Sequence, residues 1–446
     1  MQKTNFLEGR IFLPMLKFSI PIMLSIFFQQ MYNTVDTMIV GYTLGEETLA
    51  AIGVSSPIFE LFVGFALGFG NGLSIIIARS YGTRDERLLK NSVAGSIIVG
   101  LIVSIVVTVL SAIFMSPLLK LLKTPQETFA LSYSYIRKIT LFTIVLFMYN
   151  LCAGMLRAVG NSFMPLVFLI VSSVLNIALD FLFITVFKRG IDGAAEATVI
   201  SQGVSVALCI IYIYKAVPSL IPSKENFVEG KSMHKKLTVQ GLSMGFMSCI
   251  VSAGTVILQS AINGFGYLII AGHTAARRLF QVTLMPYSAM GQSVNTFVSQ
   301  NYGANNAKRI RKGMLESYIY DGVITIVMTA LIWLFAPAII KFISGSSEAE
   351  LVSYGSRYIK FMVPFYFVLG LLTITRTSLQ AIDSKILPVL SSVMELIGKI
   401  LFTILLIPRF GIKAVIVCEP LIWCFMVVEL LISFWTNKYI RTGKME

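Results

Sequence analysis

Residues 91–118 read NSVAGSIIVGLIVSIVVTVLSAIFMSPL, a run with no Asp, Glu, Lys or Arg. An α-helix rises about 1.5 Å per residue, so about 20 apolar residues are enough to cross the hydrocarbon core of a bilayer. Similar runs recur along the whole chain with short polar breaks between them, and the alternating segments of a membrane β-barrel are missing. The run at 91–118 therefore predicts a membrane-spanning helix, and its recurrence predicts an all-α polytopic membrane protein.

The composition of the chain supports a membrane location. Of its 446 residues, 56% are hydrophobic and only 13% are charged, which leaves too little polar surface for a water-soluble globule. The formal net charge is +14, but the basic residues are scattered through the polar breaks, so no nucleic-acid partner is expected. The five cysteines lack the spacing of metal ligands. We expect no cofactor other than a coupling ion.

Twelve apolar segments are long enough to be membrane helices, and an even number places both termini on one side. They lie near residues 13–40, 48–78, 91–118, 130–158, 163–187, 193–215, 237–262, 268–299, 312–341, 352–381, 386–407 and 413–437. If the amino terminus is cytoplasmic, the inner breaks carry about twice as many Lys and Arg residues as the outer ones. We therefore predict a multi-pass protein of the plasma (inner) membrane with both termini in the cytoplasm.

The two halves of the chain resemble each other. A constant offset aligns Gly45 with Gly266, Gly70 with Gly291, Tyr81-Gly82 with Tyr302-Gly303 and Gly190 with Gly411, and Pro165 meets Pro388 after a two-residue slip. Six helices per half is an even number, so the two repeats have the same orientation in the membrane. We predict two parallel six-helix lobes, 1–215 and 237–446, joined by a polar cytoplasmic linker at 216–236.

The first helical hairpin carries a longer motif. It reads QQMYNTVDTMIVG at residues 29–41 and continues with LAAIG at residues 49–53, and a further motif, LRAVGN, follows at residues 156–161. Together with the two Tyr-Gly helix ends, these motifs resemble the multidrug and toxic compound extrusion (MATE) transporters over essentially the whole chain. The resemblance implies a V-shaped two-lobed bundle that exports cationic or amphipathic drugs in exchange for protons or sodium ions.

In one branch of that family, an acidic site in the amino-terminal lobe binds the coupling cation. The resemblance assigns this role here to Asp36, Asn176, Asp180, Thr198 and Asn150, whereas a further Asn of the family pattern is Ala153 in this chain. A second branch uses an acidic residue on the seventh helix, where this chain offers only Gln259. The resemblance therefore favours the amino-terminal site.

The residues themselves lead to the same site. A charged side chain at the bilayer centre costs roughly 2.5–3.5 kcal/mol on insertion scales, and such residues commonly line water, form pairs or serve transport. Counting from the nearest outer breaks places Asp36, Asp180 and Thr198 at one depth, with Asn176 one turn below Asp180 on the same face. The oxygens of Asp36, Asp180 and Asn176 suit a sodium ion, and two close carboxylates can instead hold a proton. Structural hydrogen bonds between helices are the alternative role.

Other polar positions receive weaker assignments. Pro21, fifteen residues before Asp36, cannot donate a helical hydrogen bond, so we expect either a hinge or a static kink there. Glu395 and Lys399 lie four residues apart and either neutralise each other or line a substrate cavity. Arg277, Arg278 and Gln259 are assigned to the same cavity, and Asp321, Arg376, Glu60 and Glu419 receive no role.

Three other functions compete with drug export. A flippase for lipid-linked oligosaccharides shares the two-lobed plan, but such proteins usually have two more helices and a strongly basic cavity. No His-Glu-x-x-His or Gly-x-Ser-x-Gly motif supports an enzyme, and no filter-like loop supports a channel. We therefore expect a monomeric transporter whose partners are small cationic or amphipathic molecules and membrane lipid.

Overall fold

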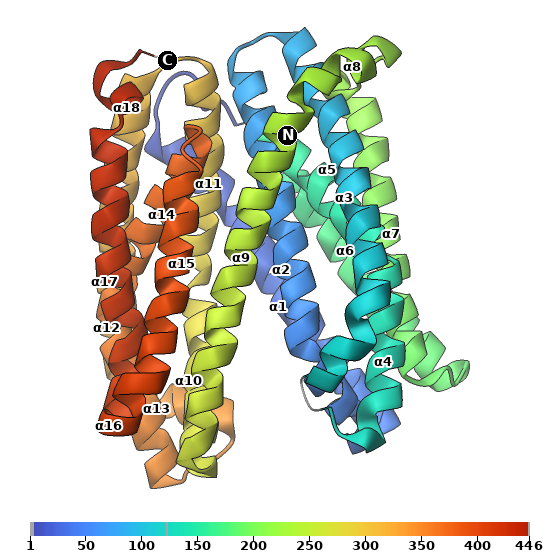
Figure 1. Ribbon diagram of the computed structural model, residues 1–446, viewed down its shortest axis with the longest axis vertical. Coiled ribbons are helices and arrows are strands. Elements are labelled where there is room, and N and C mark those ends of the chain that lie inside the picture. The colour runs from blue at the N-terminus through green and yellow to red at the C-terminus, as the bar shows by residue number, and fades with distance from the viewer. Residues whose placement is uncertain (1–3, 122–123, 445–446) are drawn as a thin grey trace. The chain divides into compact units, whose positions relative to one another are not determined.

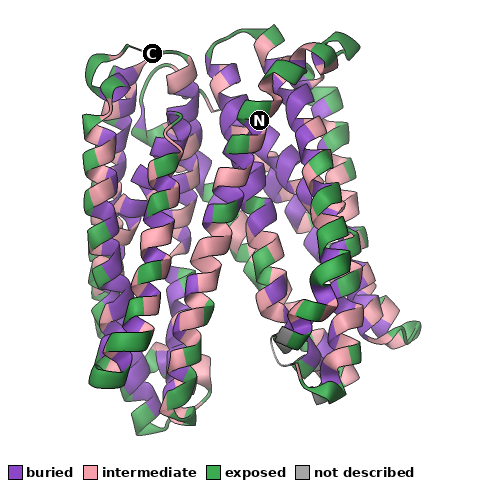
Figure 2. Cartoon of the chain, viewed as in Figure 1, coloured by how far each residue is buried: buried purple, intermediate pink, exposed green. Residues whose placement is uncertain are grey.

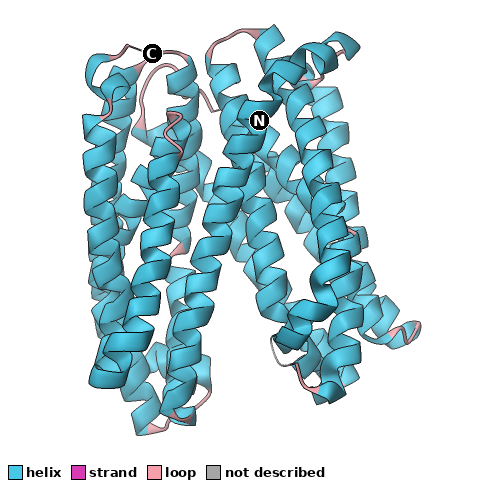
Figure 3. Ribbon diagram, in the orientation of Figure 1, coloured by secondary structure: helices cyan, strands magenta, loops and turns pink. Residues whose placement is uncertain are grey.

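The computed structural model describes residues 4–121 and 124–444, and Figures 1 and 3 show that this part of the chain is almost entirely helical. It contains no β-strand within the described residues. The α-helices are α1 (Phe12–Leu44), α2 (Glu46–Gly82), α3 (Glu86–Leu121), α4 (Gln126–Leu141), α5 (Thr143–Ala158), α6 (Phe163–Asp180), α7 (Gly190–Ala216), α8 (Lys224–Glu229), α9 (His234–Ile262), α10 (Tyr267–Thr283), α11 (Met285–Gly303), α12 (Ala307–Ser344), α13 (Ala349–Met362), α14 (Tyr366–Ala381), α15 (Ile386–Leu401), α16 (Ile407–Phe410), α17 (Ile412–Thr436) and α18 (Lys438–Thr442).

The prediction of twelve membrane helices is confirmed in the described part of the chain. Ten helical spans are long and apolar enough to cross a membrane, and α4 with α5 forms an eleventh that bends by 47°. Helices α10 and α11 occupy the remaining predicted segment at 268–299, which is more polar because it contains His273, Arg277 and Arg278. Figure 2 shows exposed residues along the outer faces of the long helices, and many of them are large and apolar, such as Ile319 and Ile326 on α12. Apolar exposed faces are expected of helices that contact lipid.

Several predicted helices are interrupted. The predicted helices at 268–299 and 352–381 break at Leu284 and at the 3-10 segment η5 (Val363–Phe365). Pro286 and Pro364 explain these breaks, because proline lacks the N–H that a continuous helix requires. The predicted helix at 130–158 breaks at Phe142. Two π-helical segments, η1 (Phe181–Val186) and η6 (Phe402–Leu406), directly follow α6 and α15.

Contacts within the chain divide it into two compact units. The N-terminal unit contains Leu24–Ser248 and Thr4, and the C-terminal unit contains Asn5–Met23 and the chain from Cys249 onward. Helices α1 and α9 therefore each contribute to both units, an exchange that the predicted domain boundaries do not include.

The predicted linker at 216–236 is structured and packs on α3 within the N-terminal unit. It contains the 3-10 segments η2 (Pro218–Leu220) and η3 (Gly230–Met233) on either side of α8. Glu229 forms an ion pair with Arg87 and accepts a 2.9 Å hydrogen bond from the Asn91 side chain. The side-chain oxygen of Asn91 in turn accepts a 2.7 Å hydrogen bond from Asn226. This segment is therefore anchored to one unit and is not a free tether.

The backbone repeats a conformation at corresponding points of the two halves. Gly45 precedes α2 with φ of 84°, and Gly266 precedes α10 with φ of 87°. A positive φ in this range is favourable mainly for glycine, so both turns require this residue. The match of Gly45 with Gly266 in the sequence therefore reflects a shared turn.

Candidate cation-coupling site

Three helices of the N-terminal unit each present two polar side chains four residues apart. These pairs are Tyr32 and Asp36 on α1, Asn176 and Asp180 on α6, and Thr198 and Gln202 on α7. Residues four apart stack on one face of a helix, so each pair can face a common centre. Helix α4 adds Tyr135, which is also buried.

Contacts bring these side chains together. The carboxyl groups of Asp36 and Asp180 lie close enough to interact with each other, although neither Asp180 oxygen makes a hydrogen bond within the described chain. The Tyr32 hydroxyl lies close to Thr198 and Gln202, and Tyr135 lies close to both carboxyl groups. An ionised carboxylate only accepts hydrogen bonds, so two neighbouring carboxyl groups can bond to each other only when one of them carries a proton.

Several atoms of this site lack the partners that their burial demands. Asp36 is 9% exposed, Asn176 1% and Asp180 0%. The Asp36 Oδ1 atom, both Asp180 carboxylate oxygens and both side-chain amide atoms of Asn176 are buried and make no hydrogen bond to any other described residue. Within the same part of the chain, neither carboxylate takes part in an ion pair with Lys or Arg.

These unsatisfied groups define what the arrangement can bind. Leaving a buried polar group unpaired costs about 1–3 kcal/mol, and more when the group is charged. A cation placed among the oxygens of Asp36, Asp180 and Asn176 would remove this cost, and so would a proton shared by the two carboxyl groups. Hard oxygen ligands of this type suit sodium and protons better than soft metals.

Neighbouring contacts hold the helices of this site in position. Lys138 on α4 places its Nζ 3.1 Å from Asp192 Oδ2 and 2.8 Å from Glu196 Oε1, both on α7. The Ser134 hydroxyl donates a 2.6 Å hydrogen bond to Asp192. These bonds fix the helix that carries Tyr135 against the helix that carries Thr198. The π-helical turn η1 begins directly after Asp180, and such widened turns are frequent at functional sites.

The structure places two other predicted residues apart from this cluster. The Asn150 amide donates a 2.9 Å hydrogen bond to the carbonyl of Leu146, and its Cβ packs close to Gly70. No contact among the described residues joins Asn150 to either carboxylate. Pro21 lies inside α1. The part of the chain from Asn5 to Met23 belongs to the C-terminal unit, so Pro21 lies two residues before the point where α1 passes into the N-terminal unit. The functional roles of Asn150 and Pro21 stay predictions.

Three of the residues predicted for a substrate cavity form a buried ion-pair network in the C-terminal unit. Lys399 Nζ lies 3.0 Å from Glu395 Oε1 and 3.3 Å from Glu419 Oε1. Arg277 Nη1 lies 2.7 Å from the other Glu419 oxygen, and Arg376 Nη2 lies 3.6 Å from Glu395 Oε2. Glu395 and Lys399 therefore form an ion pair, and their predicted role in a substrate cavity stays a prediction.

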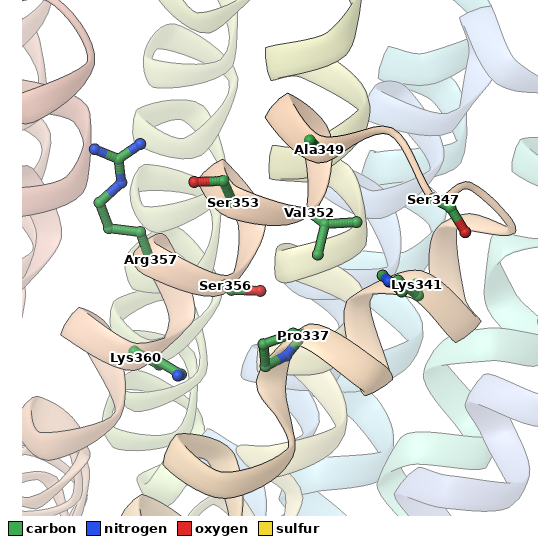
Figure 4. Close-up of a pocket in the computed structure, with 9 residues that line it drawn as sticks. All are labelled: Pro337, Lys341, Ser347, Ala349, Val352, Ser353, Ser356, Arg357 and Lys360. Carbon is green, nitrogen blue, oxygen red and sulfur yellow. The ribbon is translucent and has the colours of Figure 1, made fainter.

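The remaining two cavity predictions lie outside this network. Arg278 is exposed, and Gln259 donates a 2.9 Å hydrogen bond to Asn263. A hollow of about 620 Å³ lies between α12 and α13, where Figure 4 shows Lys341 and Lys360 around Ser356. None of the residues predicted for cation coupling or for the substrate cavity lines this hollow.

Sequence reasoning missed five members of these two clusters. Tyr32 and Gln202 stand four residues from predicted site residues, and this spacing could have identified them. Glu419 and Arg376 were visible as charges within apolar runs but had no assigned partner. Tyr135 carries no distinguishing signal, because it is one of 17 tyrosines.

Comparison with known proteins agrees with the repeat and the fold. The MatE family model matches residues 21–182 and again residues 244–405. The probable multidrug resistance protein YpnP of Bacillus subtilis (strain 168) is 30% identical over 372 residues, which cover 83% of this chain and 82% of that protein. The multidrug export protein MepA of Staphylococcus saprophyticus is 22% identical over 440 residues, covering 96% and 92% of the two chains.

A solved structure shares the fold over the full length. It is described as the outward-facing conformation of a multidrug resistance MATE family transporter of the MOP superfamily, and it is 23% identical to this chain with a TM-score of 0.87 over 99% of both chains. The family model covers most of the chain and matches once in each repeat. This chain therefore belongs to the MatE family, the multidrug and toxic compound extrusion transporters.

Proposed function

We propose that this protein is a secondary active transporter that exports organic cations or amphipathic drugs from the cytoplasm in exchange for protons or sodium ions. It works by alternating access, as a monomer in the plasma (inner) membrane with both termini in the cytoplasm. The coupling ion binds at Asp36 and Asp180, with Asn176, Thr198 and Asn150 as further members of the site. The names of the relatives YpnP and MepA support drugs as the cargo.

One observation carries this proposal: two buried carboxyl groups face each other with no basic partner among the described residues. A purely structural acidic residue inside a membrane bundle is expected to pair with Lys, Arg or a hydrogen-bond donor. In the C-terminal unit Glu395 and Glu419 follow that expectation, because each has a basic partner, whereas the buried Asp321 has none among the described residues. The N-terminal unit differs because it brings two such acids together, and this pair supports a mobile cation as their partner.

A single acidic site also gives a simple basis for exchange. Two negative charges at one place attract a coupling ion and a cationic drug alike, and each bound cation reduces the attraction for the other. A ligand shifts a conformational equilibrium only through its different affinities for the two states. Drug and ion are exchanged if the protein can change between its inward-open and outward-open states only when one of the two cations neutralises the site.

The alternative function, a flippase for lipid-linked oligosaccharides, fits the site less well. A pyrophosphate group needs several unpaired cations around it. The N-terminal site is acidic, and the basic residues Arg277, Lys399 and Arg376 of the other unit are paired with carboxylates. The described chain also has twelve membrane helices without the two additional ones.

Transport into vesicles tests the proposed function. The purified protein in liposomes, exposed to a fluorescent organic cation such as ethidium, should move it at a rate that depends on an imposed sodium or proton gradient. Collapsing the gradient with an ionophore should abolish the gradient-dependent part of the transport rate. Protein-free liposomes give the background rate. Transport of the dye at the same rate with and without either gradient would contradict ion-coupled export.

A further inference from the structure

The two repeats place different chemistry at corresponding positions. Asn176 and Lys399 each lie eleven residues after the proline at the third position of their helices, α6 and α15. Thr198 and Glu419 each lie eight residues after a positive-φ glycine at the start of α7 and α17. Two members of the N-terminal cation site therefore correspond to a buried ammonium and a buried carboxylate in the C-terminal unit.

The aromatic member of the site has a counterpart as well. Tyr135 and Tyr358 each lie nine residues after the first residue of their helices, α4 and α13, and both are buried. Tyr135 lies close to the carboxyl groups of Asp36 and Asp180, and the Tyr358 hydroxyl donates a 3.4 Å hydrogen bond to Glu419. The C-terminal unit thus builds an acidic, tyrosine-flanked site from the same parts of its repeat.

The Lys399 ammonium is surrounded by oxygen atoms as a bound cation would be. Its Nζ lies 3.0 Å from Glu395 Oε1, 3.3 Å from Glu419 Oε1 and 3.3 Å from the Thr255 hydroxyl, and its side chain is 2% exposed. A Cβ at Gly254 would lie 3.0 Å from Lys399 Cδ, so the glycine leaves room for the lysine stem.

The carboxylates that define the N-terminal site have no counterparts in the second repeat. Helix α9, which corresponds to α1, contains no Asp or Glu, and Thr403 stands fifteen residues after the α15 proline, where Asp180 stands on α6. The negative charge around Lys399 comes instead from Glu395 and Glu419, and both of them contact its ammonium group.

We propose that the Lys399 ammonium is the resident cation of the C-terminal unit, where it takes the place of the soluble ion that the N-terminal unit binds. A covalently attached cation cannot be released during transport, so the second repeat has a permanently filled site. This site of the C-terminal unit then takes no part in binding the coupling ion. This inference rests on the proposed function, because it assigns the coupling ion to one repeat.

Replacing the resident cation by a soluble one tests this inference. In a parent protein carrying Asp36→Asn and Asp180→Asn, Lys399→Ala removes the ammonium and leaves the oxygens of Glu395, Glu419 and Thr255. Thermal unfolding of the detergent-solubilised full chain is then followed at alkaline pH against increasing methylammonium. Tetramethylammonium is the matched control, because it has the same charge but no N–H donor.

We expect methylammonium, and not tetramethylammonium, to raise the unfolding midpoint of the Lys399→Ala protein. The parent and a Lys399→Arg variant should not respond, because their site is filled. If Lys399→Ala is recovered only when it is purified in methylammonium, removal of the amine should unfold it.

The inference is overturned if methylammonium and tetramethylammonium have the same effect on the unfolding midpoint of the Lys399→Ala protein. It is also overturned if that protein cannot be recovered in the presence of either cation. Comparing the wild type with the parent tests the proposed coupling site separately, because Lys399 is intact in both. A cation response of the wild type that persists in the parent would contradict the assignment to Asp36 and Asp180.

Discussion

Asp36 and Asp180 supply the charge of the proposed site, so each should be indispensable for coupling. Substitution by Asn is nearly isosteric and removes the charge that a cation neutralises. We expect Asp36→Asn and Asp180→Asn each to reduce gradient-driven efflux from vesicles to the level of protein-free liposomes, with unchanged elution as a folded protein. Asp85→Asn is the control, because Asp85 is exposed before α3 and Asn caps a helix equally well. Wild-type efflux in either site variant would remove that residue from the coupling site.

Gly370 on α14 gives a test of the packing around an unassigned buried acid. A Cβ at this position would overlap the carboxyl group of Asp321, which is 1% exposed. Overpacking costs about 1–3 kcal/mol, so Gly370→Ala should lower the free energy of unfolding by this amount. Gly203→Ala should not lower it, because a Cβ there meets no atom within 4 Å. Equal unfolding midpoints for the two variants would contradict this packing.

At the residue scale, the sequence indicates the charged members of the site better than the neutral ones. Asp36 and Asp180 stand out because charges inside apolar runs are rare and costly. Tyr135 does not stand out, because its role depends on which face of α4 packs towards α1 and α7. The pairing of Glu419 with Arg277 and Lys399 joins three helices, and no spacing in the sequence reports such a contact.

Helix α1 is the element in which a hinge is predicted. Pro21 cannot donate a hydrogen bond to the carbonyl four residues earlier, and α1 passes from one unit to the other after Met23. If this point bends during transport, Pro21→Ala should slow turnover at saturating drug more than it weakens drug binding. Pro57→Ala, inside α2, is the control for the loss of a helical proline. Equal turnover of Pro21→Ala and wild type at matched expression would show that Pro21 serves packing only.

The positions of the helices could be predicted from the sequence, but their breaks only in part. Apolar runs define each membrane span, and Pro286 and Pro364 mark two of the interruptions. The break at Phe142 has no adjacent proline or glycine, and the π-helical segments after Asp180 and Leu401 have no local signal. These features depend on packing between helices, which periodicity alone does not describe.

At the scale of the whole molecule, the distribution of Lys and Arg predicts the topology. Lys224 and Lys231 are exposed on the segment that packs against α3, and we expect both to be cytoplasmic. In a cysteine-free variant, cysteines at these positions should resist an impermeant thiol reagent added to intact cells. A cysteine at Gly264, in an exposed turn predicted to face outward, should be labelled under the same conditions. Labelling of position 224 or 231 from outside would reverse the topology.

The internal repeat could also be predicted from the sequence, whereas the exchange of helices between units could not. Matching glycines and Tyr-Gly pairs report the repeat, because both halves need the same turns. The assignment of Asn5–Met23 to one unit and of Leu24 onward to the other depends on contacts between distant segments. Apolar residues on either side of Met23 look alike in the sequence.

The central claim is that a cation bound at Asp36 and Asp180 moves opposite to the drug, and counterflow tests it most directly. Proteoliposomes without any imposed ion gradient are given an outward gradient of an organic cation, and sodium or proton entry is recorded. We predict that the drug gradient drives one of these ions inward, and that Asp36→Asn/Asp180→Asn abolishes this ion flux. Drug movement without any coupled ion entry in the wild type, or ion entry that persists in the double variant, would contradict the account.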